Sequence, residues 1–280
     1  MLTTVRAYSS WRSAPTLLLD ETGRPETDLI QIRNIDGLDP VKAAINTSLY
    51  GSVDGAAYVG GSVAARNIVL TVHPNPDWDN WSYEALRKLL YAYFMPKKST
   101  RLEFESDDLA PVGISGIVED ITVNQFSKDQ EFLVSVICPD PYFVALDPTV
   151  LTGQTNAEGP TVIEYEGTIE TGFNVKVTFV SGTVPTAIEV QVGEPPVTDL
   201  VVTAGVDATK YYELNSVAMR KYVQNIAIGG GTITNLLPKV LEGSSWPMLQ
   251  PGENDIFITT TPYGGIQDWE LTYYERFGGL

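Results

Sequence analysis

The sequence predicts an all-β protein made of two β-sandwich domains, with one α-helix in the first. Short stretches that alternate apolar and polar residues recur, as in 101–105 and 188–192, and this period of two is typical of strands with one buried face. Glycines and prolines separate the strands of the second half at roughly the 8–12-residue spacing of a sandwich. Only residues 83–94 carry a convincing helical pattern.

The predicted helix follows a strand at Ile68–Val72. Ser82 is a suitable N-cap, because its hydroxyl can accept a hydrogen bond from a first-turn amide. Apolar residues recur at helical spacing on one face: Leu86, Leu89, Leu90 and Tyr93. Pro96 disfavours a helical conformation at Met95 and therefore ends the helix.

Strands are also expected at 2–8 and 16–19, and Leu29–Ile32 is predicted to be the hairpin partner of the latter. Between residues 34 and 65 no apolar period survives. Unpatterned segments of this length are unusual inside a compact domain. Two interpretations remain open for it: a flexible loop, or an arm that becomes ordered against a neighbouring subunit.

After the helix, the alternation in 101–105 predicts that Leu102 and Phe104 face the core and that the charged residues face water. Strands at Ile114–Val123 and Phe132–Ile137 continue the meander, with a turn at 126–129. The prolines in Cys138–Phe143 close the run. We therefore predict domains at 1–146 and 147–280, the second built from strands that include Val175–Phe179, Ile188–Val192, Ile256–Ile258 and Trp269–Tyr273.

Composition excludes several classes of function. The net charge is −17, with 12 basic and 19 acidic residues in 1–143 and 6 and 16 in 144–280. Neither half has the basic stripe that binds phosphate or anionic lipid. Cys138 is the single cysteine, so no disulfide framework or cysteine metal site is expected. No signal peptide and no membrane span is expected either, which points to a protein or a neutral sugar as partner.

No catalytic, cofactor or metal site is predicted. His73 is the single histidine; it is expected in a turn, and no Gly-x-Ser-x-Gly motif accompanies any serine. The carboxylate pairs Asp107-Asp108 and Glu119-Asp120 read as solvated loop and edge charges. Asp77 and Asp79 lack the glycine and glutamate of a calcium loop. Gly229-Gly230-Gly231 lacks the lysine of a phosphate loop and reads as a hairpin turn.

A set of collinear motifs resembles the distal tail proteins of long-tailed phages. In the first half they are Arg66-Asn67-Ile68-Val69-Leu70, the helix with Phe94-Met95-Pro96, Leu102-Glu103-Phe104, Phe126-Ser127-Lys128 and Ile137-Cys138-Pro139-Asp140-Pro141-Tyr142-Phe143. In the second half they are Thr171-Gly172-Phe173, Asn235-Leu236-Leu237 and 245–254, SWPMLQPGEN. The resemblance covers nearly the whole chain, although each motif is weak by itself.

The resemblance implies a virion structural protein, assembled in the host cytoplasm into a hexameric ring at the tail tip. The first domain would contact the tail tube and the tail-tip hub protein, and residues 34–65 would clasp the neighbouring subunit. The second, a galectin-like or jelly-roll sandwich, would carry receptor-binding proteins. In a ring around a DNA channel the negative charge would repel DNA; the competing explanation for the acidic residues is solubility.

Two other classes of function remain open at the level of sequence. A carbohydrate-binding module could use an aromatic platform of Trp246, Tyr263, Tyr273 and Tyr274 to bind a host glycan, although such residues more often pack in a core. Trp246 is expected in the core, and one of Tyr273 and Tyr274 must face outward. A glycoside hydrolase would rest on the many carboxylates alone.

Overall fold

The structure is a computed structural model, and it describes residues 2–9, 17–20, 29–51, 53–76, 81–107, 110–124, 130–156, 159–193, 199–203, 209–262 and 265–280. The chain divides into two compact units. Unit 1 comprises residues 1–146 and 277–280, and unit 2 comprises residues 147–276. The domains expected from the sequence placed 277–280 in the second half; in the structure these four residues belong to unit 1.

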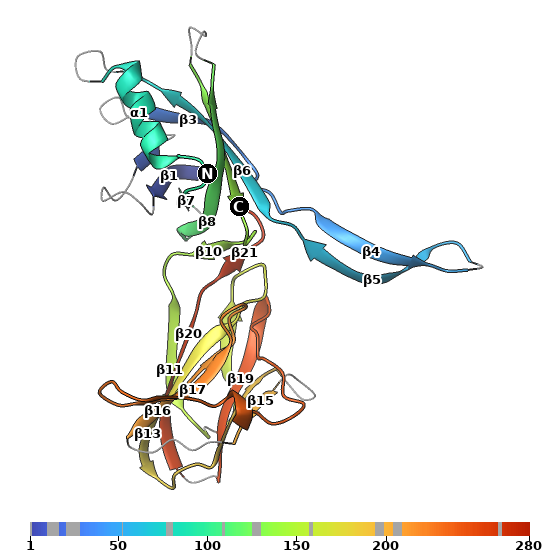
Figure 1. Ribbon diagram of the computed structural model, residues 1–280. Coiled ribbons are helices and arrows are strands. Elements are labelled where there is room, and N and C mark those ends of the chain that lie inside the picture. The colour runs from blue at the N-terminus through green and yellow to red at the C-terminus, as the bar shows by residue number, and fades with distance from the viewer. Residues whose placement is uncertain are drawn as a thin grey trace. The chain divides into compact units, whose positions relative to one another are not determined.

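Unit 1 is built on a nine-stranded sheet in the order β21-β10-β8-β7-β1-β2-β3-β6-β9 (Figure 1). Its strands are β1 (Leu2–Ser9), β2 (Leu17–Asp20), β3 (Ile30–Asp36), β6 (Arg66–Pro74), β7 (Ser99–Ser106), β8 (Val112–Val123), β9 (Phe132–Cys138), β10 (Phe143–Ala145) and β21 (Arg276–Phe277). Strand β8 pairs with both β7 and β9. The sheet therefore curls round until β9 meets β8, and the inward side chains share one core.

The helix of unit 1, α1 (Tyr83–Tyr93), forms as the sequence predicts. The Ser82 hydroxyl accepts a hydrogen bond from the Ala85 amide at 3.3 Å. The predicted apolar stripe faces the core: Leu86 and Leu90 are fully buried, and Leu89 packs against the same cluster. Phe94 follows as the C-cap, and its amide donates a hydrogen bond to the Leu90 carbonyl at 2.8 Å.

The predicted partner of β3 is wrong. Strand β2 pairs antiparallel with β1, whereas β3 runs parallel to β2 through the single register pair Asp20–Gln31. The main partner of β3 is β6, with antiparallel pairs from Ile30–Pro74 to Asp36–Val69. A hairpin between β2 and β3 would require an antiparallel pairing, and β3 gains a longer antiparallel ladder with β6.

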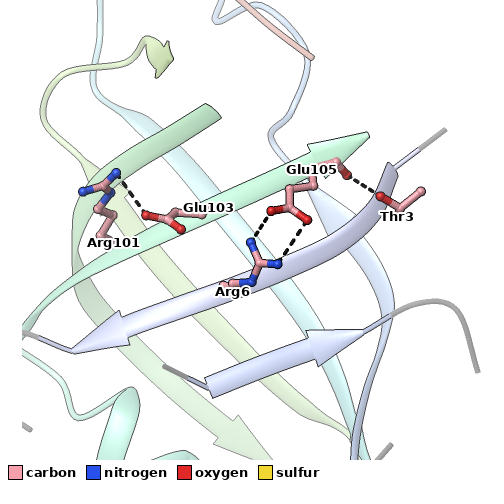
Figure 2. A network of polar contacts seen from close by, with 5 residues as sticks. All are labelled: Thr3, Arg6, Arg101, Glu103 and Glu105. Atoms are coloured by element: carbon pink, nitrogen blue, oxygen red, sulfur yellow. Dashed lines mark hydrogen bonds and ion pairs between the residues drawn. The ribbon is translucent and has the colours of Figure 1, made fainter. Parts of the chain in front are cut away.

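The outer face of β1 and β7 carries a network of ion pairs (Figure 2). Arg6 forms a two-pronged contact with the Glu105 carboxylate, and Arg101 lies 3.0 Å from a Glu103 oxygen. Leu102 and Phe104 face the core as predicted, but Glu103 is buried instead of facing water. The alternation correctly predicts that the Glu103 side chain points away from the core. It does not predict that neighbouring side chains, such as Arg101, cover it.

The segment between β3 and β6 is an antiparallel hairpin of β4 (Ala43–Leu49) and β5 (Ala56–Val63), which we call the arm. The predicted belt loop of about 34–65 therefore contains regular structure. In Figure 1 the arm projects from the ends of β3 and β6. Among the described strands, β4 and β5 pair only with each other.

Unit 2 is a sandwich of a six-stranded sheet, β11-β20-β13-β16-β17-β18, and a four-stranded sheet, β12-β19-β14-β15 (Figure 1). The strands are β11 (Thr149–Gln154), β12 (Thr161–Tyr165), β13 (Phe173–Gly182), β14 (Ala187–Val192), β15 (Asp199–Val202), β16 (Lys210–Asn215), β17 (Tyr222–Ala227), β18 (Ile233–Asn235), β19 (Gly252–Thr261) and β20 (Gly265–Tyr273). A 3₁₀ turn, η1, spans Leu237–Lys239. One buried cluster takes side chains from both sheets, such as Val175 and Leu271 from the first and Val190 and Ile256 from the second.

The fold class predicted from the sequence is thus confirmed: the protein is nearly all β, with one α-helix among the described residues. No helix in the described ranges is both long and apolar enough to span a membrane.

Candidate assembly interface: the arm and its root

The arm exposes large apolar side chains that have no cover within the chain. Their exposed fractions are 58% for Ile45, 83% for Leu49, 68% for Tyr58 and 68% for Val59. Tyr50 and Val53, near the tip, are 55% and 69% exposed. Contiguous exposed apolar surface of this kind marks an interaction site more often than a solvated face.

The two faces of the arm differ in chemistry. Residues directly opposite each other in an antiparallel pair share a face, so the register groups one apolar set: Ala43, Ile45, Thr47, Leu49, Ala56, Tyr58 and Val63. The other face carries small and polar residues: Ala44, Asn46, Ser48, Ala57, Gly60 and Ser62. We call the first set the apolar face of the arm.

Gly61 lies on the apolar face, opposite Ile45. A Cβ atom there would lie 3.2 Å from the Tyr58 hydroxyl and 3.3 Å from Ile45 Cδ1. The Tyr58 hydroxyl and Ile45 Cδ1 therefore both lie close to the glycine. A side chain at Gly61 would require these two side-chain ends, and the Ala44 carbonyl oxygen 3.1 Å away, to give by a few tenths of an ångström.

The arm also leaves both outer edges of its ladder open. A two-stranded hairpin is marginally stable in water by itself, and open edges are templates for pairing with another chain. Between residues 41 and 65 only Lys42 and Asp54 are charged. The arm thus lacks the edge charges that usually discourage such pairing, and it is suited to packing against protein.

The root of the arm, residues 37–42, requires a tight approach between chain segments. Gly37 has a φ of +91°, and a Cβ atom there would lie 2.1 Å from the Asn67 carbonyl oxygen. Both facts select glycine, since other residues rarely adopt this conformation. Gly37 therefore brings the start of the arm against the start of β6.

Arg66 binds this root from the first residue of β6. Its Nη1 donates to the carbonyl oxygens of Gly37 at 2.5 Å and Asp39 at 2.8 Å. Its Nε donates to the Pro141 carbonyl at 2.6 Å, and its Nη2 donates to the Gly278 carbonyl. One side chain thus joins the arm root, the segment before β10 and the C-terminal segment.

Arg66 is buried, with only 2% of the residue exposed to solvent. The central carbon of its guanidinium lies 4.6 Å from the centre of the Phe143 ring, in cation–π geometry. Burial lowers the pKa of Arg66, while Cys138 and Asp39 nearby oppose that shift. Among the described residues no carboxylate forms an ion pair with it, so backbone carbonyls balance the buried charge.

The histidine and the carboxylates considered as catalytic or metal-binding candidates do not form a common site among the described residues. His73 lies within β6, opposite Gln31, and not in the predicted turn. Glu119 accepts a hydrogen bond from Ser135 at 2.8 Å on an exposed face, and Asp120 binds the Ile121 amide and the Thr122 hydroxyl. Asp77, Asp79 and Asp108 lie outside the described residues, as does the predicted turn at 126–129.

Within the described ranges, no group of three or more histidine, cysteine or carboxylate side chains is placed to hold a metal ion. Gly229–Gly231 connect β17 to β18, which pair antiparallel, so the predicted hairpin turn is confirmed. Their φ values are all positive, between +85° and +158°. The triplet therefore serves the turn geometry.

The aromatic platform that the sequence left open as an alternative in unit 2 is not assembled by its three described members. Tyr273 is 3% exposed, and Trp246 packs against the core as expected, with Lys221 Nζ 5.5 Å from its ring centre. Tyr274 is 42% exposed, so one of the consecutive tyrosines does face outward. Tyr263 lies outside the described residues.

The combination of a curled sheet with one helix, an arm and a two-sheet unit matches a solved structure over its whole length. The crystal structure of SPP1 Dit (gp 19.1) covers 98% of this chain and 99% of its own, with a TM-score of 0.67 and 17% identity. The chain has the fold of SPP1 Dit. That protein is described as a paradigm of the hub adsorption apparatus in phages that infect Gram-positive bacteria.

The Dit fold confirms the resemblance predicted from the collinear motifs. Two structures of the phage P2 baseplate in its activated conformation, with Ca and with Sr, also match over the full length, at 11% and 12% identity. Their TM-score of 0.47 is too low to establish a shared fold. No protein-family model matches the chain, and no curated protein sequence does.

Sequence reasoning missed the role of Arg66. Arg66 appears in the sequence motifs only as the first residue of one of them, because a single arginine at the start of a strand carries no signal of burial. The nearest clue was its place at the start of the alternately buried strand β6, where it pairs with Cys138, directly before the proline-rich segment 139–141.

Proposed function

We propose that this protein is a structural subunit of a phage tail tip, a distal tail protein that assembles into a hexameric ring. The observation that carries the proposal is the full-length likeness to SPP1 Dit together with the exposed arm. At 17% identity the likeness concerns the fold, so the ring must be argued from this chain's own surface.

The arm supports the ring. Burying apolar surface contributes about 25 cal/mol per Å², so side chains such as Leu49 and Tyr58, more than two thirds exposed, gain stability only through an external partner. A second copy of the chain supplies one at the same concentration as the arm itself. Head-to-tail contact between an arm and a different surface of its neighbour generates a closed ring when the rotation closes.

The remaining partners follow from this assignment. One side of the ring would contact the tail tube protein, and the other would contact the tail-tip hub protein. Unit 2, a galectin-like sandwich in this proposal, would carry the receptor-binding protein. The protein would then act in the virion after assembly in the host cytoplasm, without a catalytic role.

Negative-stain electron microscopy of the purified full-length chain tests the proposal. Class averages should show rings with sixfold symmetry and a central channel. Uniform single particles of one subunit at micromolar concentration would contradict it. A closed ring of another symmetry would retain the arm contact and refute the hexamer.

A second role, recognition of a host glycan, is favoured by one feature of unit 2. On the outer face of the six-stranded sheet, Glu213 accepts hydrogen bonds from Asn174 at 3.1 Å, Tyr222 at 3.0 Å and Gln224 at 2.9 Å. These groups are held in fixed positions, and amides, carboxylates and phenols are the groups that bind sugar hydroxyls. Binding of the full-length protein to a glycan array, abolished by Glu213→Gln, would support this role, and absence of binding would refute it.

A further inference from the structure

The C-terminal residues complete the root of the arm. Strand β21 lies beside β10 in the sheet of unit 1, and Phe277 is buried in the same core. Beyond it, the Leu280 amide donates to the Leu38 carbonyl at 3.1 Å. Residues 277–280 therefore pack directly on the segment from which the arm starts.

Gly279 shows how close this packing is. A Cβ atom at Gly279 would lie 2.7 Å from Pro40 Cδ and 3.0 Å from the Leu38 carbonyl oxygen. Distances under 3 Å force the neighbours to move. Because Gly279 does not need a positive φ, a side chain there would be excluded by contact with the root alone.

Arg66 links the two segments electrostatically. Its guanidinium binds Gly37 and Asp39 on the root and Gly278 on the C-terminal segment. Arginine suits this task because its five donors are fixed in one plane, whereas lysine has a single flexible ammonium group. Without Gly278, one donor of a buried cation would lose its partner, which is costly in an interior.

The contact between Arg66 and residues 277–280 depends on the order of the segments in the chain. Unit 2, residues 147–276, lies in the sequence between the rest of unit 1 and the C-terminal segment. Residues 277–280 can therefore reach Arg66 only after all of unit 2 has been synthesised. Within unit 2, β11 pairs antiparallel with β20, so that Thr149 and Tyr273, near its two ends, lie opposite each other.

We infer that Arg66 and residues 277–280 form a latch that holds the arm root in its assembly-competent position only when the chain has returned from unit 2. Incomplete chains, or chains with a misfolded unit 2, would present a loose arm and would be excluded from the ring. The inference rests on the proposed role of the arm in assembly. Arg66 acts here as a positioning residue.

The test uses three full-length variants: Gly279→Val, Arg66→Lys and, as a matched control, Arg33→Lys. Arg33 also lies on the sheet of unit 1, but it is exposed and pairs with Glu131 at 3.3 Å. Hydrogen–deuterium exchange of the Leu280 amide, which donates to the Leu38 carbonyl, reports on the contact with the root, and light scattering reports on assembly. Exchange in α1 and β13 shows whether each unit remains folded.

Gly279→Val and Arg66→Lys should speed exchange of the Leu280 amide at least about tenfold, equivalent to 1.4 kcal/mol, and should reduce assembly, while α1 and β13 remain protected. Arg33→Lys should change neither readout. Exchange of the Leu280 amide at the wild-type rate in both latch variants would overturn the inference. Since exchange is measured within the subunit, a wild-type protein that forms no ring would refute the proposed function while leaving this test intact.

Discussion

The guanidinium of Arg66 donates a hydrogen bond to the carbonyl oxygen of Gly278, a residue 212 positions further along the chain. The same group binds the root of an exposed, apolar arm. This relationship places the only fully buried arginine among the described residues at the point where the arm root, the segment before β10 and the C-terminal segment of unit 1 meet.

Replacing Arg66 by methionine should destabilise unit 1 by about 2–4 kcal/mol, because four carbonyl oxygens lose their donor. The loss is measured as a change in the free energy of unfolding by urea titration with tryptophan fluorescence. The control Arg33→Met removes an exposed ion pair and should cost less than about 1 kcal/mol. Equal losses in the two variants would show that the Arg66 contacts contribute little.

Cys138 should resist thiol reagents in the folded protein. The side chain is fully buried, and burial raises the pKa of its thiol to about 11 from an ordinary value of 9.0, while Arg66 partly opposes the shift. Native protein at pH 8.5 should react with a thiol-specific chromophore far more slowly than protein in urea. Reaction at equal rates would contradict both the burial and the raised pKa.

The same pKa shift makes a prediction for stability. Between pH 9 and 11 the unfolded chain releases the Cys138 proton while the folded chain retains it, so the unfolded state binds fewer protons and stability falls as pH rises, by at most about 1.4 kcal/mol per pH unit. Below pH 9 both states keep the proton and this contribution to the slope vanishes. Cys138→Ala should lack it, so its slope between pH 9 and 11 should be shallower than that of the wild type.

Unit 2 should fold alone as residues 147–276. Its core cluster is internal, and both of its sheets lie within this range. The fragment should show a cooperative thermal transition and a circular dichroism spectrum without substantial helix. An unfolded fragment, or one rich in helix, would contradict the division of the chain.

The sequence was sufficient to predict elements that bury one face and expose the other. Alternation identified β7 through Leu102 and Phe104, and helical spacing with the Ser82 cap identified α1. Strands β4 and β5 were missed because both faces of the arm are exposed. A period of two reports a difference between faces in hydrophobicity, and here small residues such as Ala44 and Ala57 blur it.

The partner of β3 and the latch at Arg66 were missed for a different reason. Both depend on contacts between segments far apart in the chain, which local patterns do not encode. The candidate interface was recognised only as a segment without a pattern. Its apolar face became visible once the register aligned Ile45, Leu49 and Tyr58 on the same side.

Assembled protein should have no affinity for duplex DNA, even at low salt. A hexamer would carry about six times the net charge of −17, and a negative channel wall would repel phosphates. Gel-shift and fluorescence anisotropy measurements with short duplex DNA check this. DNA binding at low salt would instead indicate a neutral or basic channel, leaving solubility as the explanation for the acidic residues.

The most direct test of the central claim is the mass of the purified chain by multi-angle light scattering, with two arm variants measured beside it. Leu49→Asp charges the apolar face, while Ser48→Asp charges the opposite face one residue away. The wild type and Ser48→Asp should each give about 180 kDa, six times the 30.6 kDa chain, and Leu49→Asp should give a folded monomer. A wild-type mass of one chain, or a ring that persists in Leu49→Asp, would contradict assembly through the arm.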